Sequence, residues 1–232
     1  MGKKFKLLKN EERYKKISNE KLDIVNIKDG LISLDRSNPL AYICGSRNSG
    51  VTNTLNVIIN NIIQEQQKGS YELSILDCGI NLASNYKDYE TSDMCRVRGN
   101  LDVRGFQKSI DEIIIGNSNG KIKIVVIHDV DILLDSHNIN IRENILHKVM
   151  NLVDAGCYCI VGMNDYYAEA LAKEAKYVIA LKSSLRLSNQ LLKCPKATSI
   201  KAGHCMILCD GELIQEKLPL IEPKLIKENL NS

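Results

Sequence analysis

The sequence predicts an α/β fold in which a mostly parallel sheet is covered by helices on both faces. Strand-like apolar runs alternate with segments of helical periodicity along most of the chain, and this alternation is typical of parallel sheets. The strand-like runs are continuous in aliphatic residues, as in Ile124-Val125-Val126-Ile127, which is the pattern of strands buried on both faces. A chain of 232 residues with 44% hydrophobic residues can bury a sizeable core.

The elements follow from changes in hydrophobic period and from turn residues. We expect residues 1–20 to be a polar helix or linker and residues 21–232 to form a single domain. In that domain we expect a strand pair in 24–34 around Lys28-Asp29-Gly30, strands at 41–44, 72–76, 122–127, 157–161 and 177–181, and helices at 52–67, 106–115, 141–153 and 167–175. A hairpin of strands 205–208 and 213–215, with Asp210-Gly211 as its turn, ends the domain.

Charge and hydropathy argue against two classes of partner. The net charge of +3 is too small to predict a nucleic-acid partner. Lysines cluster in residues 3–16, which is typical of a solvated helix face, with a binding patch as the alternative. The sequence shows no secretory signal and no apolar stretch long enough to span a bilayer, so we expect no membrane insertion of this domain.

Eight cysteines require an interpretation. Cys44, Cys78, Cys157 and Cys159 lie in or beside apolar runs, where a free cysteine behaves as a small buried hydrophobe. We therefore expect structural thiols in a reducing compartment. The group His204, Cys205 and Cys209 is the metal-binding alternative, but its spacing matches no paired zinc knuckle, so we expect no metal.

A glycine-containing loop lies where a strand gives way to a helix, and it has the spacing of a phosphate-binding Walker A loop. It consists of Gly45, Ser46, Arg47, Asn48, Ser49, Gly50, Val51 and Thr52. Both glycines and the final threonine fit the motif, but Val51 stands where the lysine that neutralises the β- and γ-phosphates belongs. The alternatives are a strand-to-helix turn that never meets phosphate, or a loop in which Arg47 supplies the cation.

The acidic motif that should follow is also altered. A Walker B strand is an apolar run that ends in Asp, which holds Mg²⁺, often followed by a Glu that polarises water. Here the run ends in His128-Asp129, so an imidazole replaces the first acid and the second acid is one methylene shorter. The alternatives are a strand-end role for His128 and a capping or pairing role for Asp129. The next strand ends in Gly162-Met163-Asn164, where only Asn164 could sense a γ-phosphate.

The order of these pieces resembles the FtsK/SpoIIIE class of P-loop ATPases, and most of all a degenerate C-terminal ATPase domain of the type VII secretion protein EssC or EccC. The resemblance covers about residues 20–217. It is carried by 32–35 before the loop, Leu76-Asp77-Cys78-Gly79, the 122–131 strand and its exit, the segment 154–164, the strand 177–181 and the hairpin that begins at Ala202-Gly203-His204.

The resemblance implies a three-layer RecA-like P-loop NTPase fold, mostly parallel, with a C-terminal hairpin. It further implies a cytoplasmic domain of a plasma-membrane-anchored protein of Gram-positive bacteria, in which several ATPase modules follow one another and oligomerise through the parent chain. Partners would be the neighbouring ATPase modules and small helical secreted proteins, WXG100-like, that dock by an amphipathic helix in an apolar groove.

Because Val51 and His128 depart from the active pattern, we expect no catalytic residue, weak or absent binding of ATP and Mg²⁺, no other cofactor and no nucleic acid. The loop 45–52, the pair His128 and Asp129, and Asn164 would be vestiges of the nucleotide site. The expected role is regulation or recognition of secreted substrates, and the alternative is a weak NTPase or a DNA-translocase motor module.

Overall fold

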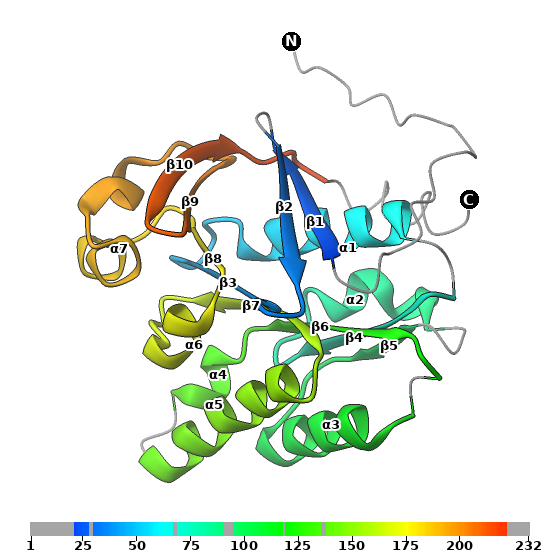
Figure 1. Cartoon of the computed structure of the whole chain (residues 1–232). Helices are drawn as coiled ribbons and strands as arrows, with labels where there is room; N and C mark the ends of the chain where they lie inside the picture. Colours follow the sequence, from blue (N-terminus) through cyan, green and yellow to red (C-terminus); the bar gives the residue numbers. More distant parts are fainter. Residues whose placement is uncertain are drawn as a thin grey trace.

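A computed structural model describes residues 21–27, 30–66, 69–90, 95–117, 119–135 and 138–221. Its main sheet has the strand order β10-β9-β8-β3-β7-β6-β4-β5 (Figure 1). Six of these strands run parallel: β3 (Leu40–Gly45), β4 (Tyr71–Asp77), β5 (Cys95–Arg98), β6 (Ile122–His128), β7 (Tyr158–Asn164) and β8 (Tyr177–Ala180). The hairpin β9 (His204–Cys209) and β10 (Glu212–Lys217) extends the sheet antiparallel to β8.

One face of the sheet is covered by α1 (Val51–Glu65), α2 (Ala83–Tyr86) and the short 3-10 helix η1 (Lys87–Tyr89), as Figure 1 shows. A separate antiparallel pair, β1 (Lys21–Ile27) and β2 (Gly30–Asp35), lies against α1 on the same side. Alternate residues of the strands point to this face, where Ile43, Ile75 and Ile160 form a core together with Leu55 of α1. Such two-sided burial explains why the strands are continuously apolar.

The opposite face carries α3 (Val103–Ile115), α4 (Asp131–Leu134), α5 (Ile139–Asp154) and α6 (Glu169–Glu174). The helix α7 (Leu185–Leu192) and the 3-10 helix η2 (Pro195–Ser199) contribute to the same core beside β8 and β9. On α5, Ile145, Val149 and Leu152 are buried along one face, as their spacing predicts. The three-layer fold with a mostly parallel sheet and a C-terminal hairpin is therefore confirmed.

The predicted elements are all present among the described residues, with shifted ends. Asp210 and Gly211 have φ of 49° and 82°, so both central turn residues are left-handed, as a two-residue hairpin turn requires. The sequence prediction missed β5 and α7, and also the four-residue helices α2 and α4. Arg96 and Arg98 interrupt β5, which is a four-residue edge strand, and α7 is only eight residues long. The polar helix or linker predicted for residues 1–20 lies outside the described residues.

Candidate functional site

The loop Gly45–Thr52 lies at the carboxyl end of β3, at the same edge of the sheet as the ends of β4, β6 and β7. In open α/β sheets this edge is where ligands bind. Gly50 directly precedes α1 and has φ of 110°, a backbone conformation that residues with a side chain rarely adopt. A Cβ at Gly45 would lie 2.7 Å from the Leu181 Cβ, so this glycine is required by close packing. Local sequence chemistry therefore explains the strand-loop-helix connection.

Three backbone N–H groups of the loop already donate to the protein. The Ser46 N–H donates to the Lys182 carbonyl at 2.8 Å and the Ser49 N–H to the Ser46 carbonyl at 2.9 Å. The Arg47 N–H donates to a carboxylate oxygen of Asp165 at 3.0 Å. A phosphate cradle needs such N–H groups to point at its ligand. The first turn of α1 keeps N–H groups that have no acceptor within the helix.

Val51 points into the core. Its side chain is 2% exposed and packs between α1 and β7. Gly162 of β7 makes room for it, because a Cβ at that position would lie 2.9 Å from Val51 Cγ1 and 2.8 Å from Leu55 Cδ1. The position at which a lysine would reach phosphates is thus occupied by a buried apolar contact between helix and sheet.

His128 ends β6 with its ring fully buried between two neighbouring elements. Its Nδ1 lies 2.9 Å from Asp77 Oδ1, and its Nε2 lies 3.1 Å from the Thr52 hydroxyl. Asp77 also accepts the N–H groups of Gly79 at 3.0 Å and of Leu82 and Ala83 at 2.9 Å each. Because an ionised carboxylate has only acceptors, the Nδ1 of His128 carries a hydrogen and donates it to Asp77.

Asp129 and Asn164 meet beside His128. The Asn164 amide donates to Asp129 Oδ1 at 2.7 Å, and the same oxygen lies 3.3 Å from His128 Nε2. The Asn164 N–H donates to Asp131 Oδ1 at 3.1 Å. Burial raises the pKa of both Asp129 and Asp131; the nearby imidazole of His128 lowers it, and the neighbouring carboxylates raise it further. Asp129 has φ of 54°, a conformation that Asp tolerates better than most residues.

The structure thus brings Thr52, His128, Asp129 and Asn164 into one cluster at the end of the sheet. Arg47 is exposed, and its charge acts on Asp129 only as the smallest of the effects that shift its pKa. Sequence reasoning did not name Asp77 as a site residue. The signal was present, because Asp77 ends an apolar strand as His128 does, and the two are register partners on adjacent parallel strands.

Most of the cysteines are buried. All eight are free, and only Cys194 and Cys209 are partly exposed. Burial raises the pKa of Cys44, Cys95 and Cys205 to about 12. Consecutive residues of a strand point to opposite faces, so β9 separates His204 from Cys205. Among the described residues, the group whose ligand atoms lie close enough together for a metal ion is Asp77, His128 and Asp129.

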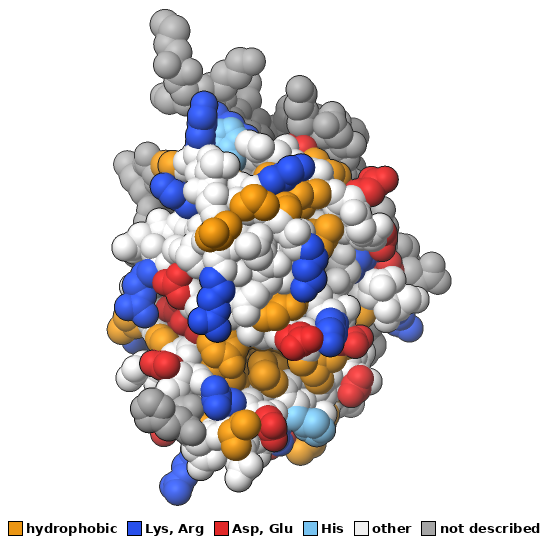
Figure 2. Space-filling view, turned by 90° about the vertical axis from the view of Figure 1, so that its left-hand side faces the viewer, with side chains coloured by type: hydrophobic (Ala, Val, Ile, Leu, Met, Phe, Trp, Pro, Cys, Tyr) orange, Lys and Arg blue, Asp and Glu red, His pale blue; other side chains and the backbone are white. Residues whose placement is uncertain are grey.

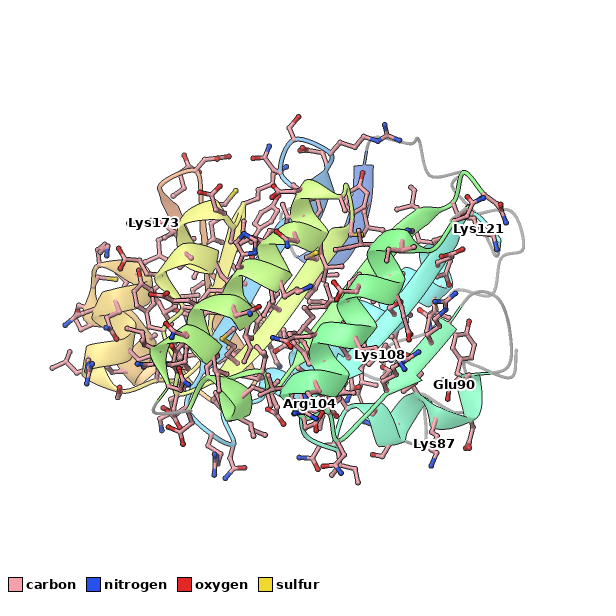
Figure 3. The ribbon with its side chains drawn as sticks, turned by 90° about the horizontal axis from the view of Figure 1, so that it is seen from below. Lys87, Glu90, Arg104, Lys108, Lys121 and Lys173 are labelled. Carbon is pink, nitrogen blue, oxygen red and sulfur yellow. The ribbon has the colours of Figure 1, made fainter. Side chains whose placement is uncertain are left out.

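The described surface has an open concavity of about 650 Å³ on α3 and the edge strand β5. It is lined by Arg96, Arg104, Gln107, Lys108, Asp111, Glu112, Ile115 and Gly116. Figure 3 shows Arg104 and Lys108 on α3. Five of these eight residues are charged, and Ile115 is apolar. On the side toward α7 and the hairpin, hydrophobic side chains alternate with charged ones (Figure 2).

The sequence matches no protein-family model and no curated protein. Its fold matches solved P-loop ATPases. EccC from Thermomonospora curvata has 14% identity over 92% of this chain, with a TM-score of 0.61, and a second structure, of its ATPases 2 and 3, holds a signal sequence peptide. EssC (ATPases 2 and 3) from Geobacillus thermodenitrificans has 12% identity over 87% and a TM-score of 0.65. The pCW3 conjugation coupling protein TcpA, solved with ATPγS, has 15% identity over 94% and a TM-score of 0.66.

The chain spans 31% of the EccC structure, 45% of the EssC structure and 72% of the TcpA structure. No helix in the described part of the chain has the length and apolarity needed to cross a membrane. At these identities the likeness establishes the architecture. The chain therefore has the RecA-like P-loop ATPase fold that the EccC and EssC ATPase domains share with the FtsK-like coupling protein TcpA.

Proposed function

We propose that this chain is a non-hydrolysing ATPase-like domain of a type VII secretion ATPase, and that it serves in regulation or in the recognition of secreted proteins. The observation that carries this proposal is the buried Val51, which fills the core where an active site needs a lysine on the phosphates. The parent protein would be anchored in the plasma membrane with this domain in the cytoplasm. This domain would contact the neighbouring ATPase domains of the same parent chain.

The losses at the nucleotide site act on both binding and chemistry. A hydrogen bond to a charged group contributes about 1.5–3 kcal/mol, so loss of the lysine weakens nucleotide binding roughly tenfold to a hundredfold. His128 offers a ring nitrogen where Mg²⁺ prefers carboxylate oxygens. The N–H groups of Ser46 and Arg47 are also engaged by the protein. We therefore propose that ATP and Mg²⁺ are not working cofactors of this domain.

Thermal unfolding with Mg-ATP tests this half of the proposal. Ligand at about a hundred times its dissociation constant stabilises a protein by about 2.7 kcal/mol, so we expect millimolar Mg-ATP to leave the melting temperature unchanged. Val51→Lys is the matched variant: its ammonium must leave the core toward the loop, and we expect weak nucleotide binding without phosphate release, because His128 is unchanged. A clear rise in melting temperature of the unaltered protein at low micromolar ATP contradicts the proposal.

The concavity on α3 and β5 is the surface on which we place the protein partner. Its two acids are already paired within the domain, Glu112 with Arg98 at 2.6 Å and Asp111 with Lys148. Arg96, Arg104 and Lys108 are exposed on the rim, with Lys108 Nζ 3.9 Å from Glu112 Oε1, and Ile115 is 83% exposed beside them. This arrangement suits a short helical segment that carries acidic side chains around one apolar anchor.

Binding of a small helical secreted protein of the WXG100 type tests this placement. We expect Ile115→Ser to weaken binding about tenfold, because the apolar anchor loses its contact. Ile139→Ser is the matched control, since Ile139 is also exposed but lies at the start of α5. Binding should not change with ATP. Equal effects of the two substitutions, or no binding to the unaltered domain, would reject the concavity as the docking site.

A DNA-motor module is the second candidate, and the basic rim of the concavity is the observation that favours it. Arg96, Arg104 and Lys108 could contact phosphates, and the similar fold of TcpA belongs to a conjugation coupling protein. Phosphate contacts make affinity fall steeply with salt. Binding to plain duplex DNA with a steep salt dependence, lost in Arg104→Glu with Lys108→Glu, would replace the secretion proposal by this one.

A further inference from the structure

The Asp77, His128, Asp129 and Thr52 side chains lie together at the end of the sheet, and sequence reasoning assigned no metal to them. They come from the ends of two neighbouring strands, from the residue after β6 and from the first turn of α1. We infer that this cluster binds one divalent transition-metal ion of the zinc type, with His128 Nε2, Asp129 and the Thr52 hydroxyl as its protein ligands. This inference is independent of the proposed partner and of the absence of ATP hydrolysis.

The donor distances fit a single ion. His128 Nε2 lies 3.3 Å from Asp129 Oδ1 and 3.1 Å from Thr52 Oγ1. Nitrogen and oxygen ligands sit about 2.0–2.2 Å from zinc. Two such ligands that bind one ion at angles between about 90° and 110° are therefore about 2.8–3.6 Å apart. Both distances from His128 Nε2 fall in this range, so Asp129 and Thr52 can each share an ion with the imidazole after small adjustments, and water could complete its coordination.

The imidazole is held in the tautomer that a metal requires. Its Nδ1–H donates to Asp77 Oδ1 at 2.9 Å, which leaves the lone pair of Nε2 directed toward Thr52 and Asp129. Asp77 cannot turn away, because three backbone N–H groups hold its two oxygens. A histidine ligand that donates its other N–H to a carboxylate is the usual arrangement at protein metal sites.

The carboxylate of Asp129 is positioned in the same way. The Asn164 amide donates to its Oδ1 at 2.7 Å. Gly79 leaves space for the other oxygen, since a Cβ there would lie 2.5 Å from Asp129 Oδ2. The Asp129 side chain is 10% exposed and Thr52 is half-buried, so the cluster reaches the surface at these two residues. Oriented ligands and access from the surface are two conditions for a plausible site.

The ligand chemistry favours a different ion from the Mg²⁺ of an active P-loop. Mg²⁺ prefers oxygen ligands, whereas imidazole suits zinc, copper, iron and nickel. With His128 in place of the Walker B acid, the cluster should therefore prefer an ion such as Zn²⁺ over Mg²⁺ and should not simply lose metal binding. The carboxylates of Asp77 and Asp129 lie 2.9 Å and 3.3 Å from the two ring nitrogens of His128, so a divalent cation would offset their charge.

Calorimetric titration of metal-free protein with Zn²⁺ and, separately, Mg²⁺ tests the inference. We expect one Zn²⁺ per chain at micromolar affinity or tighter and no measurable Mg²⁺ binding. Asp129→Asn keeps the side-chain shape and an accepted backbone conformation, and it should weaken Zn²⁺ binding at least tenfold. His128→Asn should abolish it. Circular dichroism and thermal unfolding establish that both variants are folded.

Matched controls separate this cluster from other zinc-binding groups. His204→Asn and Cys209→Ser lie on the hairpin, and we expect neither to change Zn²⁺ affinity. Co²⁺ in place of Zn²⁺ should give visible absorption without a thiolate charge-transfer band, because no cysteine belongs to the ligand set. The inference is overturned if no stoichiometric binding occurs, if binding survives in Asp129→Asn and His128→Asn, or if Co²⁺ shows thiolate ligation.

Discussion

At the scale of single residues, the main difference between this site and the Walker A pattern is the packing of Val51 against Gly162. A glycine in β7 leaves space beside α1, and a valine in the first turn of α1 fills it. Taken separately, Val51 and Gly162 are only uncommon residues at positions of the P-loop ATPase motifs. Together they form a buried contact between helix and sheet at the position where the Walker A pattern has a lysine.

Gly162→Ala tests this pairing. The added methyl group would come within 2.9 Å of Val51 Cγ1, and overpacking of this kind typically destabilises a protein by about 1–3 kcal/mol. Urea unfolding measures the loss. In the Val51→Ala background the same substitution should destabilise less, because Cγ1 is gone, although Leu55 still limits the space. Additive effects of the two substitutions would show that Val51 and Gly162 are not coupled.

At the scale of elements, α1 differs from α3 and α7 in how it begins. α1 starts from Gly50 without a side-chain cap, whereas α3 and α7 start from Asp102 and Ser184, whose side chains accept backbone N–H groups. An uncapped helix start leaves N–H groups for another acceptor. The loop Gly45–Thr52 thus has one physical feature of an anion site, although Val51 stands where the Walker A pattern has a lysine.

Removal of the α3 cap should have a larger effect than removal of the α7 cap. Asp102 accepts the Gly105 N–H at 2.7 Å, and Ser184 accepts the Leu187 N–H at 3.3 Å. Loss of such a cap typically costs about 0.5–2 kcal/mol. We expect Asp102→Ala to lose stability near the upper end of this range, because the hydrogen bond of Asp102 is shorter and its acceptor is a carboxylate. We expect Ser184→Ala to lose stability near the lower end. Denaturant unfolding of both variants decides the order.

At the scale of the whole molecule, two cores lie on opposite faces of one sheet, and buried thiols belong to both. Cys95 and Cys205 lie in the core under α1, while Cys44, Cys157 and Cys159 lie in the core under α3 and α5. Burial raises their pKa values because the thiolate loses its hydration. The thiols therefore behave as packing groups in the folded protein.

These thiols make stability depend on alkaline pH. The pKa of Cys44, Cys95 and Cys205 is about 12 and that of Cys157 about 11 in the folded protein, against about 8.5 in an unfolded chain. Above that value the unfolded chain releases protons that the folded protein keeps, so the free energy of unfolding should fall between about pH 9 and pH 11. Cys95→Ser should make this decline shallower in pH-dependent thermal unfolding.

The accessible thiols provide the check on this interpretation. At neutral pH we expect a thiol reagent to label only Cys194 and Cys209 rapidly, because these two alone among the eight are partly exposed. The remaining cysteines should react after denaturation. Rapid labelling of Cys95 or Cys205 in the folded protein would contradict the assignment of these residues to the core.

The sequence by itself determined the α/β class, the order of the predicted strands and helices, and the replacements at Val51 and His128. These features are local: hydrophobic period identifies a strand or helix, and a motif position is found by counting residues. The same reasoning missed β5 and α7, because a four-residue edge strand interrupted by Arg96 and Arg98 and a helix of eight residues carry weak periodic signals.

Only the tertiary structure decided what the replaced residues do. Asp77 and His128 are 51 positions apart, yet parallel pairing of β4 and β6 makes them neighbours and fixes the imidazole. Val51 turns toward Gly162 because α1 packs on β7 and the glycine leaves space for the valine side chain. The order of residues along the chain does not reveal this space. Register and packing between distant segments are set by the burial of the whole sheet, so no local pattern contains them.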